Sequence, residues 1–142
     1  MAWIEGSMVR SDSRLIRPRA IWDLADWDPE SETVHGIALS ELHANGFYAD
    51  AVLEWFGAHV GDAELLSDAP EFNQHWLDTL LSGAAPQIKD FEWTAWDAFG
   101  DNGTIQAGRF SRVSKTKASR VSKHRAASDA EDMAFTWLSA LK

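Results

Sequence analysis

Five histidines are the first candidates for chemistry, because two imidazoles at a short fixed spacing can hold a metal ion. They stand at His35, His43, His59, His75 and His124. Two-histidine metal motifs place about three to five residues between their ligands, and the closest pair here is eight residues apart. The chain contains no cysteine, so thiolate ligands, thiolate nucleophiles and disulfides are excluded. We therefore expect no metal site.

Carboxylates and glycines offer no stronger catalytic motif. Asp26, Asp28 and Glu30 are near neighbours, but they lack the glycine and the final bidentate glutamate of a calcium loop. No G-x-S-x-G motif and no glycine-rich phosphate loop occurs, and Gly100–Gly103 is typical of a hairpin turn. We therefore expect a protein that is not an enzyme and that needs no cofactor.

Charge is strongly segregated along the 142 residues, whose net charge is −9. Residues 20–108 hold 17 acidic residues and one lysine, whereas residues 109–125 hold seven basic residues and no acid. The acidic block should attract basic partners and repel nucleic acid, and the basic segment should do the opposite. Alternatively, the basic segment lies against the acidic body within the fold.

Helical periodicity dominates the middle and the end of the chain. Apolar residues recur at helical spacing over residues 36–60, with an interruption at Asn45-Gly46, and again over residues 70–82, where Phe72 and Trp76 belong to the apolar face. We expect Gly46 to end the first helix in the left-handed conformation. Ser128 and Glu131 have the spacing of a capping box before an apolar stripe that predicts an amphipathic C-terminal helix.

Strand signals lie between these helices. Phe91, Trp93 and Ala95 alternate with Glu92, Thr94 and Trp96, Asn102-Gly103 is a strong turn signal, and Thr104–Thr116 reads as a returning strand. Residues 111–118 and 119–126 form a short internal repeat, SRVSKTKA and SRVSKHRA. Residues 20–33 read as an irregular segment that ends in a solvated turn at residues 30–33.

These elements predict an α+β fold with central helices, a small antiparallel meander of two to four strands and the amphipathic C-terminal helix. The length fits one domain over residues 20–142, and the arginine-rich residues 1–19 form a flexible or edge N-terminal arm. No apolar stretch is long enough for a membrane span or a signal peptide, so we expect a cytoplasmic protein.

Our first functional hypothesis is a small acidic module that binds a protein partner with a basic surface. Inhibitors of this kind include nucleic-acid mimics, immunity proteins and phage anti-defence proteins, which would make this a phage or bacterial protein. Eight tryptophans favour an interaction role, and Trp96, on the outward face of the predicted strand, is the aromatic candidate. The acidic contact candidates are Asp23, Asp26, Asp28, Glu30, Glu32, Asp62, Glu64, Asp68 and Glu71.

Two alternatives use the charge differently. In the first, the basic segment binds the phosphates of a nucleic acid. Its candidate contacts are Arg109, Arg112, Lys115, Lys117, Arg120, Lys123 and Arg125. In the second, the chain is a structural subunit of a phage or secretion assembly, in which the acidic body of one copy meets the basic segment of the next.

Overall fold

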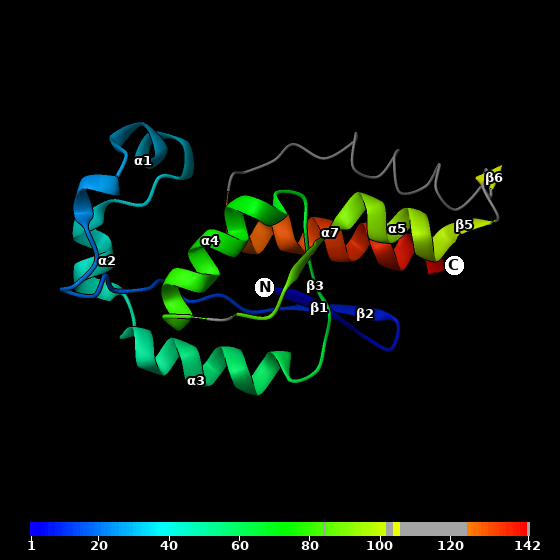
Figure 1. The fold of residues 1–142 in the computed structure, drawn as a ribbon, viewed down its shortest axis with the longest axis horizontal. Coiled ribbons are helices and arrows are strands. Elements are labelled where there is room, and N and C mark those ends of the chain that lie inside the picture. Colours follow the sequence, from blue (N-terminus) through cyan, green and yellow to red (C-terminus); the bar gives the residue numbers. More distant parts are fainter. Residues whose placement is uncertain (84, 102–103, 106–124, 142) are drawn as a thin grey trace.

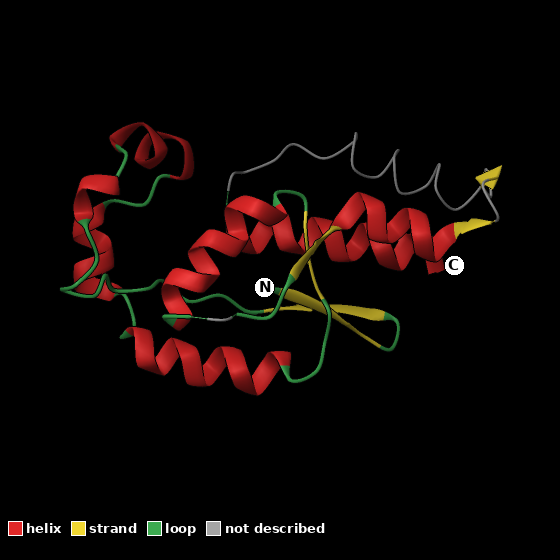
Figure 2. Cartoon of the chain, in the orientation of Figure 1, coloured by secondary structure: helices red, strands yellow, loops and turns green. Residues whose placement is uncertain are grey.

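The computed structural model describes residues 1–83, 85–101, 104–105 and 125–141. Helices and short two-stranded sheets alternate along the described chain (Figures 1 and 2). The elements are β1 (Ala2–Glu5), β2 (Met8–Ser11), the 3-10 helix η1 (Leu24–Asp26), α1 (Pro29–His35), α2 (Leu39–Asn45), α3 (Ala49–Val60), β3 (Leu65–Ser67), α4 (Pro70–Leu81), β4 (Ile88–Asp90), α5 (Phe91–Phe99), β5 (Gly100–Asp101), β6 (Thr104–Ile105) and α7 (Ala126–Leu141).

The α+β class is confirmed, although the strands do not form one meander. β1 and β2 make an antiparallel hairpin, β3 and β4 make a parallel pair, and β5 and β6 pair antiparallel on either side of the predicted Asn-Gly turn. The parallel pair was not predicted; α4 connects its two strands, as a parallel connection requires. The returning strand beyond Ile105 and the internal repeat lie outside the described residues, apart from Arg125 and Ala126.

Residues 91–99 correct the sequence prediction, because they form helix α5 and not a strand. Phe91, Ala95 and Phe99 recur every four residues and are all buried. Asp90 caps the helix by accepting a hydrogen bond from the Trp93 N–H at 2.8 Å. The six-residue alternation fits a strand, but the buried positions follow the helical period over all nine residues.

The first core cluster joins α5 to α7. Phe91, Ala95 and Phe99 of α5 are buried together with Ala140 of α7. The Trp137 ring meets the Phe99 ring edge-on with 4.9 Å between centroids. Figure 1 shows α5 and α7 running alongside each other in the part of the molecule farthest from α1 and α2.

α7 also packs against the N-terminal hairpin of β1 and β2. This helix begins at Ala126, so Ser128 lies inside its first turn and the predicted capping box is wrong. The Asp129 N–H donates to the Arg125 carbonyl at 2.9 Å, which places the start of the helix before Ser128. Glu131 instead accepts a hydrogen bond from the Ser11 hydroxyl, and this contact links α7 to the end of β2.

A second cluster holds α3 and α4 together. Ala49 and Val52 of α3 are buried with Leu80 of α4, and Ile16 and Trp22 pack against them.

The predicted interruption between α2 and α3 is confirmed, but Gly46 has φ −69° and ψ 141°, which is extended and not left-handed. Residues 30–33 also differ from the prediction, because they belong to α1 and not to a turn.

Candidate interaction surface

The candidate carboxylates fall into two groups in the fold. The α1 acidic group comprises Asp23, Asp26, Asp28, Glu30 and Glu32, which lie on or beside η1 and α1. The β3 acidic group comprises Asp62, Glu64, Asp68 and Glu71, which flank β3 between the end of α3 and the first turn of α4. Figure 1 places α1 at one end of the molecule and β3 near its centre, so the two groups form separate surfaces.

Two members of the α1 acidic group hold local structure together. Asp23 caps η1 by accepting the Ala25 N–H at 2.9 Å. Asp28 caps α1 in the same way, through the Glu30 N–H at 2.9 Å. α1 has no buried residue, so the Asp28 cap contributes to its stability where packing does not.

Five other candidate carboxylates form neither a hydrogen bond nor an ion pair with any described residue. They are Glu30, Glu32, Asp62, Asp68 and Glu71. All except the half-buried Glu32 are exposed. In contrast, Glu64 pairs with the Lys89 ammonium. The five carry negative charge that no described cation neutralises.

Most of the basic candidates lie outside the described residues, namely Arg109, Arg112, Lys115, Lys117, Arg120 and Lys123. Arg125 is described, and its guanidinium donates a hydrogen bond to the Gly36 carbonyl at 3.1 Å. Gly36 is the residue that ends α1, so this cation lies at the end of the helix where unpaired carbonyls concentrate negative potential.

The exposed aromatic residues differ from the sequence prediction. Trp96, the predicted contact, is 37% exposed on α5, but Trp93, assigned to the inward face, is 75% exposed. On α4, Phe72 and Trp76 were expected in the core and are instead 64% and 45% exposed. Their rings meet edge-on with 6.0 Å between centroids. Phe72, Trp76 and the buried Leu80 follow one another at four-residue spacing, so they share one stripe of α4 that is buried only at its C-terminal end.

A surface groove of about 470 Å³ runs beside the exposed face of α4. It is lined by Pro70, Glu71, Gln74, Asp78, Ala85, Gln87 and Ile88. Gln74 connects its two sides: its amide NH₂ donates to Asp78 at 3.0 Å, and its carbonyl accepts the Ile88 N–H at 2.8 Å. The charged lining residues, Glu71 and Asp78, are both acids, so the groove favours a cation.

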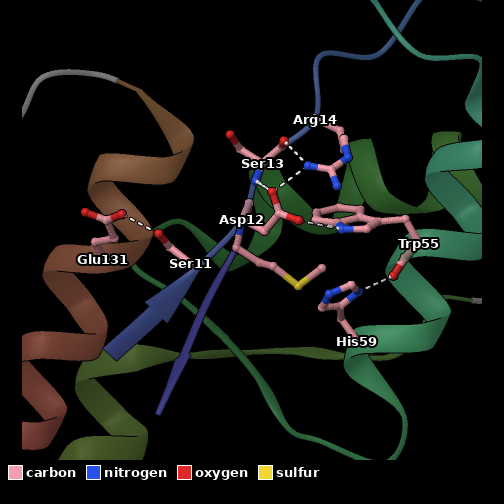
Figure 3. Close-up of polar contacts among 8 residues, drawn as sticks. Ser11, Asp12, Ser13, Arg14, Trp55, His59 and Glu131 are labelled. Carbon is pink, nitrogen blue, oxygen red and sulfur yellow. Dashed lines mark hydrogen bonds and ion pairs between the residues drawn. The ribbon is translucent and has the colours of Figure 1, made fainter. Parts of the chain in front are cut away.

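The residue that sequence reasoning missed altogether is Asp12, at the end of the hairpin (Figure 3). Its carboxylate accepts hydrogen bonds from the Ser13 N–H at 2.8 Å, from the Arg14 guanidinium and from the Trp55 indole N–H at 3.0 Å. The hydrogen bond from Arg14 is the main reason that the pKa of Asp12 lies below its ordinary value of 3.8.

Trp55 connects this carboxylate to two further side chains. The Arg14 guanidinium lies over the Trp55 ring, 5.1 Å from its centroid, and His59 Nδ1 lies 2.7 Å from the Trp55 carbonyl oxygen. The Met1 ammonium donates to the Asp12 carbonyl at 2.9 Å, and burial lowers the pKa of that amino group. These contacts join the hairpin to α3, so we assign the cluster a structural role.

Within residues 1–83, 85–101, 104–105 and 125–141, no group of three or more His, Asp or Glu side chains is placed to hold a metal ion. No helix in the described part of the chain is long and apolar enough to cross a membrane. No family model, curated protein or solved structure matches this chain.

Proposed function

We propose that this protein is a small acidic protein-binding module, of the inhibitor or immunity type, that engages a basic surface on a partner protein. The observation that carries the proposal is the set of five carboxylates without a partner among the described residues. They are Glu30, Glu32, Asp62, Asp68 and Glu71.

Their physical effect follows from their exposure. A single exposed ion pair contributes only about 0.2–1 kcal/mol, so no one carboxylate would hold a partner. Several like charges on one surface act together, because their combined field accelerates association with an oppositely charged partner and rejects wrongly charged ones. Binding should therefore weaken as salt screens the field.

The test is capture of a partner by the immobilised chain from a lysate of cells that express it, with and without nuclease. D28N/E30Q/E32Q removes three of the five charges of the α1 acidic group. D62N/D68N/E71Q removes three of the four charges of the β3 acidic group and leaves Glu64, which pairs with Lys89. The control, E5Q/E54Q/D97N, removes three exposed charges outside both groups.

We expect one protein, bound in stoichiometric amount and resistant to nuclease, that is released at high salt. At least one of the two test variants should weaken its binding about tenfold while the control does not. Equal retention by all variants would refute the proposal. Recovery of nuclease-sensitive nucleic acid alone would favour binding through residues 109–125, and recovery of the chain itself would favour the structural subunit.

A further inference from the structure

We propose that the outer edge of β1 pairs with the same edge of a second copy of this chain, which makes a two-fold symmetric dimer. The two hairpins would then form one continuous sheet in the order β2–β1–β1–β2, with the central strands antiparallel. This inference is independent of the proposed function, because it uses backbone groups of the hairpin and none of the candidate carboxylates.

The hydrogen bonds of the hairpin establish which backbone groups face outward. The Met1 ammonium donates to the Asp12 carbonyl at 2.9 Å, and the Asp12 N–H donates to the Met1 carbonyl at 3.1 Å, so these residues form a hydrogen-bonded pair. Such pairs alternate with non-hydrogen-bonded pairs along an antiparallel ladder. In the observed register Ala2 and Ile4 belong to the non-hydrogen-bonded pairs, so their N–H and C=O groups point away from β2.

This edge of the hairpin is open. Among the described residues, none forms a hydrogen bond with the outward backbone groups of Ala2 or Ile4, and β1 pairs with no strand other than β2. A row of unpaired N–H and C=O groups at a sheet edge is a template for a further strand. The edge can therefore accept a strand without any change in the hairpin itself.

Symmetry leaves one register in which every outward group of β1 is used. Ala2 of each copy must lie opposite Ile4 of the other, and each of these pairs then exchanges two hydrogen bonds. Trp3 lies between them on the symmetry axis, directly opposite Trp3 of the second copy, in a pair where side chains are closest. Trp3 is 37% exposed, and an aromatic pair in this position stabilises the pairing of two strands.

β2 is a poorer edge for the same purpose. Its outward groups belong to Val9 and Ser11, and a symmetric pairing that uses all of them places Arg10 directly opposite Arg10 of the second copy. Like charges in that position are destabilising. The side chains therefore favour pairing through β1.

The charge of the chain sets the salt dependence of the dimer. Each copy carries a net charge of −9, so the two copies repel each other and salt should strengthen their pairing. Salt would instead weaken a self-contact between the acidic body and the basic segment, or the binding of a basic partner. Two paired four-residue strands make a small interface, so we expect a dissociation constant on the order of 100 µM.

Sedimentation velocity from about 10 µM to about 1 mM, at low and high salt, is the first test. We expect a dimer that grows with protein concentration and with salt. Ala2→Pro removes an outward N–H from β1 and should weaken association about tenfold, whereas Val9→Pro, which removes the corresponding N–H from β2, should not. Circular dichroism checks that both variants stay folded.

Cysteine substitution tests the register without proline, because the chain has no cysteine of its own. W3C places two thiols opposite each other, within reach of a disulfide, with oxidised glutathione as the oxidant that is reduced. E5C lies on the same strand, but its two thiols would be roughly 14 Å apart, four residues along the pair. We expect W3C to form the disulfide-linked dimer about ten times faster than E5C or R10C.

Several results would overturn the dimer. They are a chain that stays monomeric at about 1 mM in high salt, self-association that weakens with salt, equal cross-linking of W3C and E5C, and fastest cross-linking of R10C, which would place the contact on β2. A monomeric chain whose capture of a foreign protein is weakened by Ala2→Pro would assign the edge to that partner. The proposed function is tested separately, because these variants leave both acidic groups intact.

Discussion

Replacing Gly46 with alanine should destabilise the protein, although the backbone conformation at this position suits any residue. With φ −69° and ψ 141°, an alanine would suffer no torsional strain. The obstacle is space, because an added Cβ would lie 2.4 Å from the Leu42 carbonyl oxygen and 2.6 Å from the Arg17 backbone nitrogen. Both neighbours are backbone atoms, so no side chain can rotate away.

The loss of unfolding free energy can be estimated from the backbone shift that the added Cβ requires. Restoring a 3.0 Å contact with the Leu42 oxygen requires a shift of roughly 0.6 Å. That shift would disturb the β-bridge between Ile16 and Phe47. In this bridge the Arg17 N–H donates to the Phe47 carbonyl and the Phe47 N–H donates to the Leu15 carbonyl, both at 2.8 Å. Overpacking costs about 1–3 kcal/mol and each weakened hydrogen bond about 0.5–1.5 kcal/mol, against a gain of about 0.4–1 kcal/mol from a stiffer unfolded chain. We expect a net loss of about 2 kcal/mol.

Urea unfolding followed by tryptophan fluorescence and far-UV circular dichroism measures this loss. Gly57→Ala is the matched control: Gly57 lies within α3, and its Cβ would meet no atom within 4 Å. That substitution should raise the free energy of unfolding by about 0.5–1 kcal/mol, because alanine favours helix. If Gly46→Ala is as stable as the wild type or as Gly57→Ala, the close approach of residues 15–17 to the end of α2 is wrong.

Two further predictions concern the α5 core and the hairpin. Phe99→Ala should lower the free energy of unfolding by about 3–5 kcal/mol and Trp93→Ser by less than about 0.5 kcal/mol, measured by urea unfolding; similar losses would argue against helix α5. Because the folded pKa of Asp12 is lowered, the stability it contributes is present above its unfolded pKa near 3.8 and is lost as the pH falls through the folded pKa. The unfolding free energy of the wild type should therefore fall more steeply below pH 3.8 than that of Asp12→Asn, and parallel curves would contradict this reasoning.

The sequence predicted those helices for which the residues that mark an end and the apolar periodicity indicate the same boundaries. Pro70 marks the start of α4, and the Asn45-Gly46 pair separates α2 from α3, as the sequence indicates. α5 could not be predicted in the same way, because its short alternation is compatible with both periods. The contacts that favour a helix over a strand come from Trp137 and Ala140, about 40 residues later in the chain.

The candidate site was predicted only in its charge. The sequence shows that residues 20–108 are acidic, but the separation into two surfaces depends on how the helices pack. Phe72 and Trp76 illustrate a second limit. Phe72, Trp76 and Leu80 lie on one stripe of α4, but only Leu80 is buried, in the cluster with Ala49 and Val52 of α3. The periodicity specifies the stripe and not how much of its length another helix covers.

The acidic residues of this chain include some that cap helices and others that pair with no described residue. Asp23, Asp28 and Asp90 cap helices, and these acids would be needed in a protein with no partner at all. The five unpaired carboxylates have no such role among the described residues, so they are the charges that a binding function explains. The substitution chosen for Asp28 respects this distinction, because asparagine caps a helix about as well as aspartate. D28N/E30Q/E32Q therefore removes three of the five charges of the α1 acidic group while preserving the cap of α1, and a loss of binding in that variant would report on electrostatics and not on the unfolding of α1.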